Sequence, residues 1–203
     1  MRFLAAIAIF LVTSILVMSN ANAQMRVYEV RSLLLQYNIS EKEADSIIGI
    51  LESNLSVEKR SDILPISGIL YTSGFNGAFF VDHDTWELNA TFRSPETDQL
   101  ITLPEFITVD FRNGGIKIEL SYKWMFVIVP SGTSIQSLNG ASYGGPLLGR
   151  GAGITIDPGI GIDVAAMTGV NRGGCLFVIA PKVGFGAGLV FPRMDFSVKS
   201  VNR

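Results

Sequence analysis

The chain has 203 residues, of which 48% are hydrophobic and 17% are charged, with 16 basic and 18 acidic side chains. The charges are scattered without a basic run, which excludes the electrostatic footprint of a nucleic-acid-binding protein. The single cysteine, Cys175, excludes an internal disulfide, so the fold has to rely on its apolar core.

The first 23 residues have the three-part pattern of a secretory signal peptide. Arg2 supplies a positive charge, residues 3–18 form an apolar run, and Ala21-Asn22-Ala23 is a small-residue cleavage site. The apolar run is shorter than the about 20 residues that a membrane-spanning helix needs. We therefore expect cleavage near Ala23 and a mature periplasmic or secreted chain that begins at Gln24. An uncleaved membrane anchor is the alternative.

Residues 24–60 are expected to form two short helices. Residues 27–37 have apolar side chains at helical spacing, and Ser40 followed by Glu43 is a capping box that starts a second helix. One apolar stripe of this second helix consists of Ala44, Ile47, Ile48, Leu51 and Leu55. The stripe predicts that one face of the helix packs against the rest of the protein.

Residues 61–203 are predicted to form a β-rich domain that packs with the helical segment as one unit. The hydrophobic period changes from 3.6 to 2 near Leu64, and we count eight to ten strands. The alternation favours antiparallel pairing. Only residues 124–129 and 175–180 are continuous apolar runs, so we expect these two strands to be central. The predicted class is α+β and β-dominated, with the helices covering a curved antiparallel sheet or a small barrel.

Three polar motifs are expected to be turns. Asn113-Gly114-Gly115 separates two alternating runs, which is the strongest short signal of a β-hairpin. Asp157-Pro158-Gly159 is typical of a turn between two strands. Asp82-His83-Asp84 is expected at a polar hairpin tip. Each motif therefore predicts a reversal of the chain.

Glycine takes alternate positions in two stretches. Neither stretch is followed by the helix that a dinucleotide-binding loop requires, so both are expected to be strands with one bare face. A bare face allows close packing against protein, or a groove for lipid or a small molecule. The candidate groove residues are Gly149, Gly151, Gly153, Gly184, Gly186 and Gly188.

The sequence indicates no catalytic residue, no metal site and no cofactor. His83 is the only histidine, and its acidic neighbours would face the opposite side of a strand. Cys175 is expected to be a small buried apolar residue. The carboxylates that a glycosidase would need are expected on solvated strand faces. They are Glu105, Asp110, Glu119, Asp157 and Asp163. We therefore predict that the protein is not an enzyme.

Four segments resemble the SYLF-type β-rich domains and related small periplasmic proteins of bacterial envelopes. They are "LPEFITVDF", "IELSYKWMFVIVPSGTSIQSL" with a short helix at 134–138, "IGIDVAAMTG", and "GGCLFVIAPKVGFGAGLVF" as a closing hairpin. The resemblance covers roughly residues 64–199. It implies association with membrane lipid, or an envelope-support role, without catalysis.

Two functions follow from these observations. The first is an exported, non-enzymatic binding or envelope-support protein, whose partner is membrane lipid or another envelope component and not nucleic acid. The alternative is a small outer-membrane β-barrel of about eight strands, which the signal pattern, short turns and alternation also allow.

Overall fold

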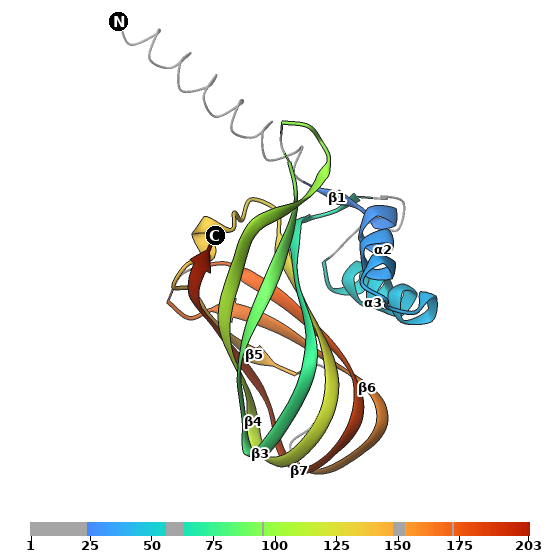
Figure 1. Ribbon diagram of the computed structural model, residues 1–203, viewed down its shortest axis with the longest axis vertical. Coiled ribbons are helices and arrows are strands. Elements are labelled where there is room, and N and C mark those ends of the chain that lie inside the picture. The colour runs from blue at the N-terminus through green and yellow to red at the C-terminus, as the bar shows by residue number, and fades with distance from the viewer. Residues whose placement is uncertain (1–23, 56–62, 95, 148–152, 172) are drawn as a thin grey trace, which may run out of the picture. The chain divides into compact units, whose positions relative to one another are not determined.

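The computed structural model describes residues 24–55, 63–94, 96–147, 153–171 and 173–203 (Figure 1). The predicted signal peptide lies outside the described residues. The elements are β1 (Met25–Arg26), α2 (Val27–Gln36), α3 (Glu41–Asn54), β2 (Ile63–Leu64), β3 (Ile66–Arg93), β4 (Leu100–Pro130), the 3-10 helix η1 (Gln136–Leu138), β5 (Ser142–Pro146), β6 (Gly153–Gly169) and β7 (Cys175–Asn202). Three strands are therefore much longer than the sequence predicted, with 28, 31 and 28 residues in β3, β4 and β7.

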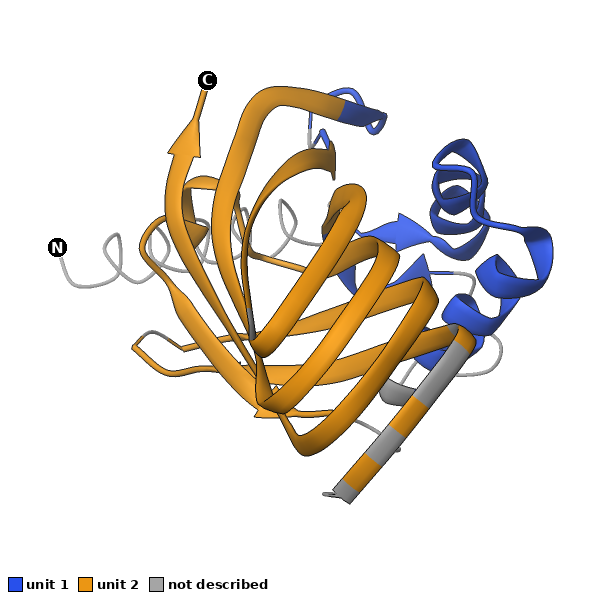
Figure 2. Cartoon of the chain, turned by 60° about the horizontal axis from the view of Figure 1, so that its bottom comes forward, with its two compact units in different colours: residues 1–67, 93–101 blue, residues 68–92, 102–203 orange. Residues whose placement is uncertain are grey.

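The chain divides into two compact units, which Figure 2 colours separately. The first comprises residues 1–67 and 93–101, and the second comprises residues 68–92 and 102–203. Both helices belong to the first unit, and nearly all of the strand residues belong to the second.

In the first unit, α2 and α3 pack against each other, which confirms the two predicted helices. The predicted capping box starts α3. Ser40 Oγ accepts a hydrogen bond from the Glu43 amide at 3.4 Å, and the Glu43 carboxylate accepts one from the Ser40 amide at 3.2 Å. These contacts satisfy two amides that the first turn of a helix leaves without intrahelical partners.

A buried arginine holds the loop between β3 and β4 in the first unit. The Arg93 side chain is 2% exposed, and its guanidinium binds the carboxylate of Glu29 on α2 and that of Asp98, the latter at 2.7 Å. Burial favours loss of the Arg93 charge, but the bonds to both carboxylates outweigh burial and raise the pKa of the guanidinium. The arginine is therefore a permanent cation between two carboxylates.

The second unit is a strongly curled antiparallel half-barrel sheet, which confirms the predicted β-dominated class. The strand order is β3-β4-β7-β5-β6, and β6 also pairs with β7. The two continuous apolar runs lie next to each other in the central strands, as predicted, because Phe126 pairs with Ile179 and Val127 with Val178.

The predicted hairpin at Asn113-Gly114-Gly115 is wrong. β4 continues through these residues and pairs with β7 from Phe106 to Ile128. Asn113 pairs with Met194 and Gly115 with Val190, so one residue of β4 faces three of β7. The motif is a β-bulge, and the positive φ of 126° at Gly115 serves this irregularity and not a chain reversal.

The other predicted reversals are also strand residues. Residues 157–159 lie inside β6 and pair with residues 184–186 of β7. Residues 82–84 lie inside β3. The predicted closing hairpin of residues 173–191 is wrong as well, since residues 175–202 form one strand. Each of these motifs therefore lies within a long strand and does not end it.

Figure 1 shows β3, β4 and β7 bending near their middles, at one end of the second unit. The two arms of β3 approach closely, because the Phe92 ring occupies the space that a Cβ on Gly68 would need and Trp86 lies against Gly74. The core of this unit contains apolar residues from both arms, including Leu70 and Leu88 of β3 and Val109 of β4.

Candidate functional site

β4 keeps one pleat along its length. Its odd-numbered residues from Ile107 to Val129 are buried, apart from the half-buried Gly115, and we call their side of the sheet the inner face. At both ends of the strand the inner residues are apolar core residues. Between them, from Asn113 to Lys123, the inner face is polar.

The polar middle of the inner face is a cluster of charged side chains and one serine, none more than 9% exposed. The inner cluster consists of Lys117, Glu119, Ser121 and Lys123 of β4, Asp163 of β6 and Lys182 of β7. The expectation that Glu119 and Asp163 lie on solvated faces is therefore wrong.

Glu119 is the centre of the inner cluster. Its carboxylate oxygens lie 2.5 Å from Lys117 Nζ and 2.8 Å from Lys123 Nζ, and Ser121 Oγ donates a hydrogen bond to it at 2.7 Å. Lys182 Nζ lies 3.7 Å from the same carboxylate. The ammonium groups satisfy the carboxylate in a place where an unpaired charge would be very costly.

The Lys182 ammonium also connects the cluster to β6, since it lies 3.2 Å from Asp163 Oδ2. Burial by itself raises the pKa of the Glu119 carboxyl, but the surrounding lysines outweigh burial and lower that pKa to about 2. The carboxylate is therefore ionised at ordinary pH, and the cluster is a charged network across three strands.

The outer face above this network is apolar. The exposed large apolar residues of this region, which we call the outer zone, are Phe75, Phe79 and Phe80 of β3, Ile116, Ile118, Leu120 and Tyr122 of β4, Ile154 and Ile156 of β6, and Val183, Phe185, Leu189 and Phe191 of β7. Sheets with one face in water normally bury apolar residues and expose polar ones. Here the arrangement is reversed.

Strand register makes the outer zone continuous. Leu189 of β7 pairs with Ile116 of β4 on one side and with Ile154 of β6 on the other, and Phe185 pairs with Leu120. At the far end, the Tyr122 ring packs edge-on against Trp124 with ring centroids 5.0 Å apart. Patches of this kind on soluble proteins mark surfaces that bind partners or membranes.

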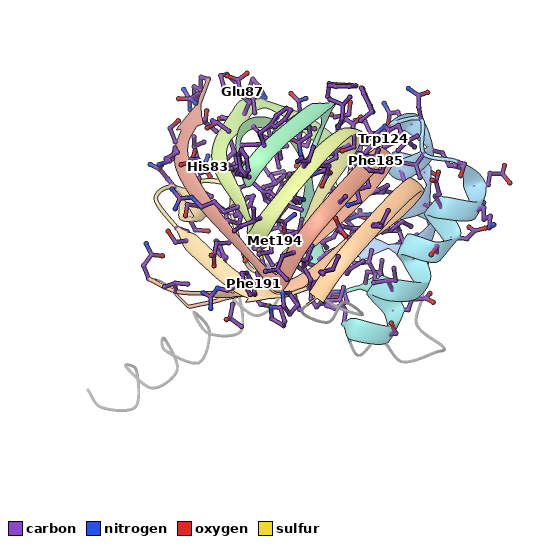
Figure 3. The ribbon with its side chains drawn as sticks, turned by 90° about the horizontal axis from the view of Figure 1, so that it is seen from below. His83, Glu87, Trp124, Phe185, Phe191 and Met194 are labelled. Atoms are coloured by element: carbon purple, nitrogen blue, oxygen red, sulfur yellow. The ribbon has the colours of Figure 1, made fainter. Side chains whose placement is uncertain are left out.

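The other arm of the sheet has the ordinary arrangement. Its outer positions include the exposed His83 and Glu87 of β3 and Lys199 of β7, whose ammonium lies 2.7 Å from Asp110. Figure 3 shows His83 and Glu87 on one side of the view and Phe185 with Trp124 on the other. The reversal is therefore confined to part of the sheet.

The glycines of β7 stand beside the inner cluster. Gly188 pairs with Lys117, Gly186 with Glu119 and Gly184 with Ser121. A Cβ on Gly188 would lie 2.5 Å from the Lys117 Cα, and one on Gly184 would lie 2.5 Å from the Ser121 Cα. At these two positions β4 lies too close for a side chain.

The second glycine stretch gives less information. Gly153 is the first residue of β6 and pairs with Val190, whereas Gly149 and Gly151 lie outside the described residues. A small cavity of about 10 Å³ lies between Gly186 and the inner cluster. This is about the space that one water molecule needs, so the cavity does not admit an organic substrate.

Other candidate positions lie apart from this site. Cys175 is exposed at the start of β7, so its predicted burial is wrong. In the part of the chain that the structure describes, no three His, Cys, Asp or Glu residues gather as metal ligands. No helix within the described ranges is long and apolar enough to cross a membrane.

The alternation of β4 is visible in the sequence, but its structural consequence is not. The apolar residues are odd-numbered from Ile107 to Phe111 and even-numbered from Ile116 to Trp124, and from Met125 to Val129 every residue is apolar. The first phase change coincides with Asn113-Gly114-Gly115, the motif that predicts a turn. In a continuous strand, such a change turns apolar side chains to the outer face and charged ones to the inner face.

The comparisons with known proteins give no assignment. No family model matches the chain, and no curated protein or solved structure matches it significantly.

Proposed function

We propose that the protein is an exported, non-enzymatic protein that binds membrane lipid through the outer zone of its sheet. The observation that carries the proposal is the reversed alternation. Leu120 is 56% exposed, while its neighbour Glu119 is 2% exposed and held by lysines. Strands that face lipid alternate in this way, with apolar side chains outward and polar ones inward.

The distribution of charge favours lipid over a second protein as the occupant. On β4 and β7, the described outer positions from Gly114 to Trp124 and from Val183 to Phe191 carry no charged side chain. The next outer position of β4 beyond the bulge is the exposed Arg112, which pairs with Asp195 of β7. The exposed Arg193 lies within the bulge and forms an ion pair with Asp195 at 3.1 Å. Two guanidinium groups and one carboxylate leave this border with a net positive charge, and an uncharged surface with such a border complements acyl chains bordered by lipid phosphates.

The aromatic residues support the same orientation. Along the outer face of β4, Arg112 comes first, aliphatic side chains follow, and Tyr122 and Trp124 come last. Tyrosine and tryptophan are enriched where protein meets the membrane–water interface. The segment from Ile116 to Tyr122 spans about 20 Å at the usual rise of a strand, which suits insertion into one leaflet.

The alternative of a small outer-membrane β-barrel also has reversed alternation in its favour. It requires lipid around the whole circumference, however, and the outer face of the other arm presents His83, Glu87 and Lys199. Charged residues on a lipid-facing surface are costly. If only the side of the sheet that carries the outer zone enters the membrane, the charged residues of the other arm stay in water.

The test is flotation with vesicles of phosphatidylethanolamine and phosphatidylglycerol, using protein purified from the exported fraction of a producing cell. Mass spectrometry first establishes whether residues 1–23 have been removed. Protein that rises with the vesicles and is released by neither high salt nor alkaline carbonate supports hydrophobic insertion. Protein that stays at the bottom of the gradient contradicts the proposal.

The same preparation separates the alternatives. Recovery without detergent, as a soluble protein that then binds added vesicles, supports partial insertion. Recovery only in detergent, with heat-modifiable migration on gels, supports the outer-membrane barrel. Self-association without vesicle binding indicates that a second copy covers the outer zone.

A further inference from the structure

We propose that the bend of β3 is the insertion tip of this surface, with Phe79 and Phe80 as the residues that enter the acyl chains. The proposal rests on the lipid binding proposed above and names the anchor within it. The two side chains are 72% and 66% exposed, among the highest values for large apolar residues in the described part of the chain.

Adjacent strand residues normally face opposite sides of a sheet. Phe80 has the even number of the buried inner residues Ala78 and Leu88, and would be expected to point inward with them. Its φ of 69° lies in the left-handed region and interrupts the pleat. As a result, two consecutive phenylalanine rings are exposed at the same bend.

This backbone conformation is unfavourable for a bulky residue, and glycine would adopt it readily. Of the described non-glycine residues, only Asn38 and Asp98 share a positive φ, and both are short polar types that tolerate it. The Phe80 side chain is not buried in the core, so burial does not offset the unfavourable backbone conformation. A strained and exposed ring points to a use that requires the ring outside the fold.

Two hydrogen bonds between β3 and β4 show which part of β4 lies beside the bend of β3. Tyr122 donates a hydrogen bond to Ser73 Oγ at 3.1 Å, and Thr85 donates one to Asp110 at 3.0 Å. The bend at Phe80 therefore lies beside the stretch of β4 between those partners. Figure 1 shows the bends of β3 and β4 at the same end of the second unit.

The tip is thus continuous with the outer zone and close to its cationic border. Arg112 lies within the stretch of β4 that the two contacts bracket, and Arg193 lies in the facing bulge of β7. Arginine at this level can bind lipid phosphate while aromatic rings enter the acyl region. The apolar rings of the tip and the guanidinium of Arg112 together fit a phospholipid surface as the occupant.

The decisive variant is Phe80→Gly, because it removes the ring and at the same time relieves the backbone. We expect the melting temperature to rise or stay unchanged, and partition into vesicles of phosphatidylethanolamine and phosphatidylglycerol to fall about tenfold. Phe80→Trp should retain binding. Tyr28→Ala, which removes an exposed ring from α2, is the matched control and should bind as the parent does.

Insertion depth gives an independent readout. Tryptophan fluorescence of Phe80→Trp should be quenched by lipids brominated on the acyl chains, beyond the quenching of the two native tryptophans, whereas Tyr28→Trp should add no quenching. If the parent protein floats with vesicles but Phe80→Gly floats equally well and position 80 is not quenched, the tip assignment is overturned and the lipid-binding function stands. If the parent protein does not float, both proposals fail.

Discussion

Glu119 and Leu120 are neighbours on β4 and face opposite sides of the sheet, with the glutamate 2% exposed and the leucine 56% exposed. The buried carboxylate is held by Lys117 and Lys123, and the exposed leucine belongs to a continuous apolar surface. Because a strand has only two faces, the charged network inside fixes which side chains point out. The inner cluster and the outer zone are therefore one feature of the fold.

Glu119→Gln should destabilise the protein strongly, by about 3 to 5 kcal/mol, because it leaves the buried ammonium groups without their shared partner. Chemical denaturation followed by circular dichroism measures the change. Glu87→Gln, at an exposed position of β3, is the control and should have little effect. Equal stability of the two variants would contradict the structural role of the cluster.

The same residue predicts a pH dependence. The pKa of Glu119 is lowered from 4.5 to about 2 in the folded protein, so its contribution is complete above pH 4.5 and is lost as the pH falls toward 2. The lost stability is about 3 kcal/mol. Denaturation midpoints measured across this window should fall less steeply for Glu119→Gln than for the parent, and parallel slopes would count against the assignment.

Gly188→Ala tests the close approach of the two central strands. A Cβ at this position would lie 2.3 Å from the Ile116 carbonyl oxygen, so β4 and β7 have to separate. We expect a loss of about 1 to 3 kcal/mol in the free energy of unfolding. Gly77→Ala is the matched control, because the nearest atom to its Cβ is a Leu120 methyl at 3.8 Å. If Gly188→Ala leaves the free energy of unfolding unchanged, the two strands can accommodate a methyl group, and the close approach is contradicted.

Arg93→Met tests the buried ion pairs of the first unit. The substitution leaves the Glu29 and Asp98 carboxylates without the guanidinium, and we expect a loss of about 3 kcal/mol. The control is Arg31→Met, which removes an exposed ion pair with Asp45 and should hardly change the melting temperature. Similar melting temperatures for the two variants would be the contrary result.

The cationic border makes a separate prediction about salt. Combined Arg112→Gln and Arg193→Gln should weaken vesicle binding about fivefold for each arginine at low ionic strength, and less at high ionic strength. Lys199→Gln, on the polar arm, should change binding less. Partition coefficients measured over a salt series provide the check, and a double variant that binds like the parent would remove the arginines from the interface.

Local patterns predicted the helices and the central strands well. Ser40 and Glu43 determine the start of α3 through contacts within one turn, and the continuous apolar runs around Phe126 and Ile179 can only be central. The bends were not predictable in this way. Asn113-Gly114-Gly115 has the chemistry of a hairpin turn, but a long-range pairing with β7 keeps the chain extended.

The candidate site could not be predicted from the sequence for the same reason. The sequence gives the alternation around Glu119 but not which phase faces inward, since that depends on residues 163 and 182 arriving from other strands. Once the pairing is known, the phase of the alternation in each part of β4 explains which side chains lie on each face. The exposure of Phe80 depends on a single backbone angle, which no local sequence pattern predicts.

The most direct test of the central claim is the vesicle partition coefficient of a double variant, Leu120→Asn with Phe185→Asn. Both side chains are exposed and paired across β4 and β7, so the fold should tolerate the change. We predict a loss of about a hundredfold in binding to phosphatidylethanolamine–phosphatidylglycerol vesicles. The control, Ile101→Asn with Val170→Asn, removes exposed apolar side chains elsewhere and should bind as the parent does. Unchanged binding of the Leu120/Phe185 variant would contradict the account.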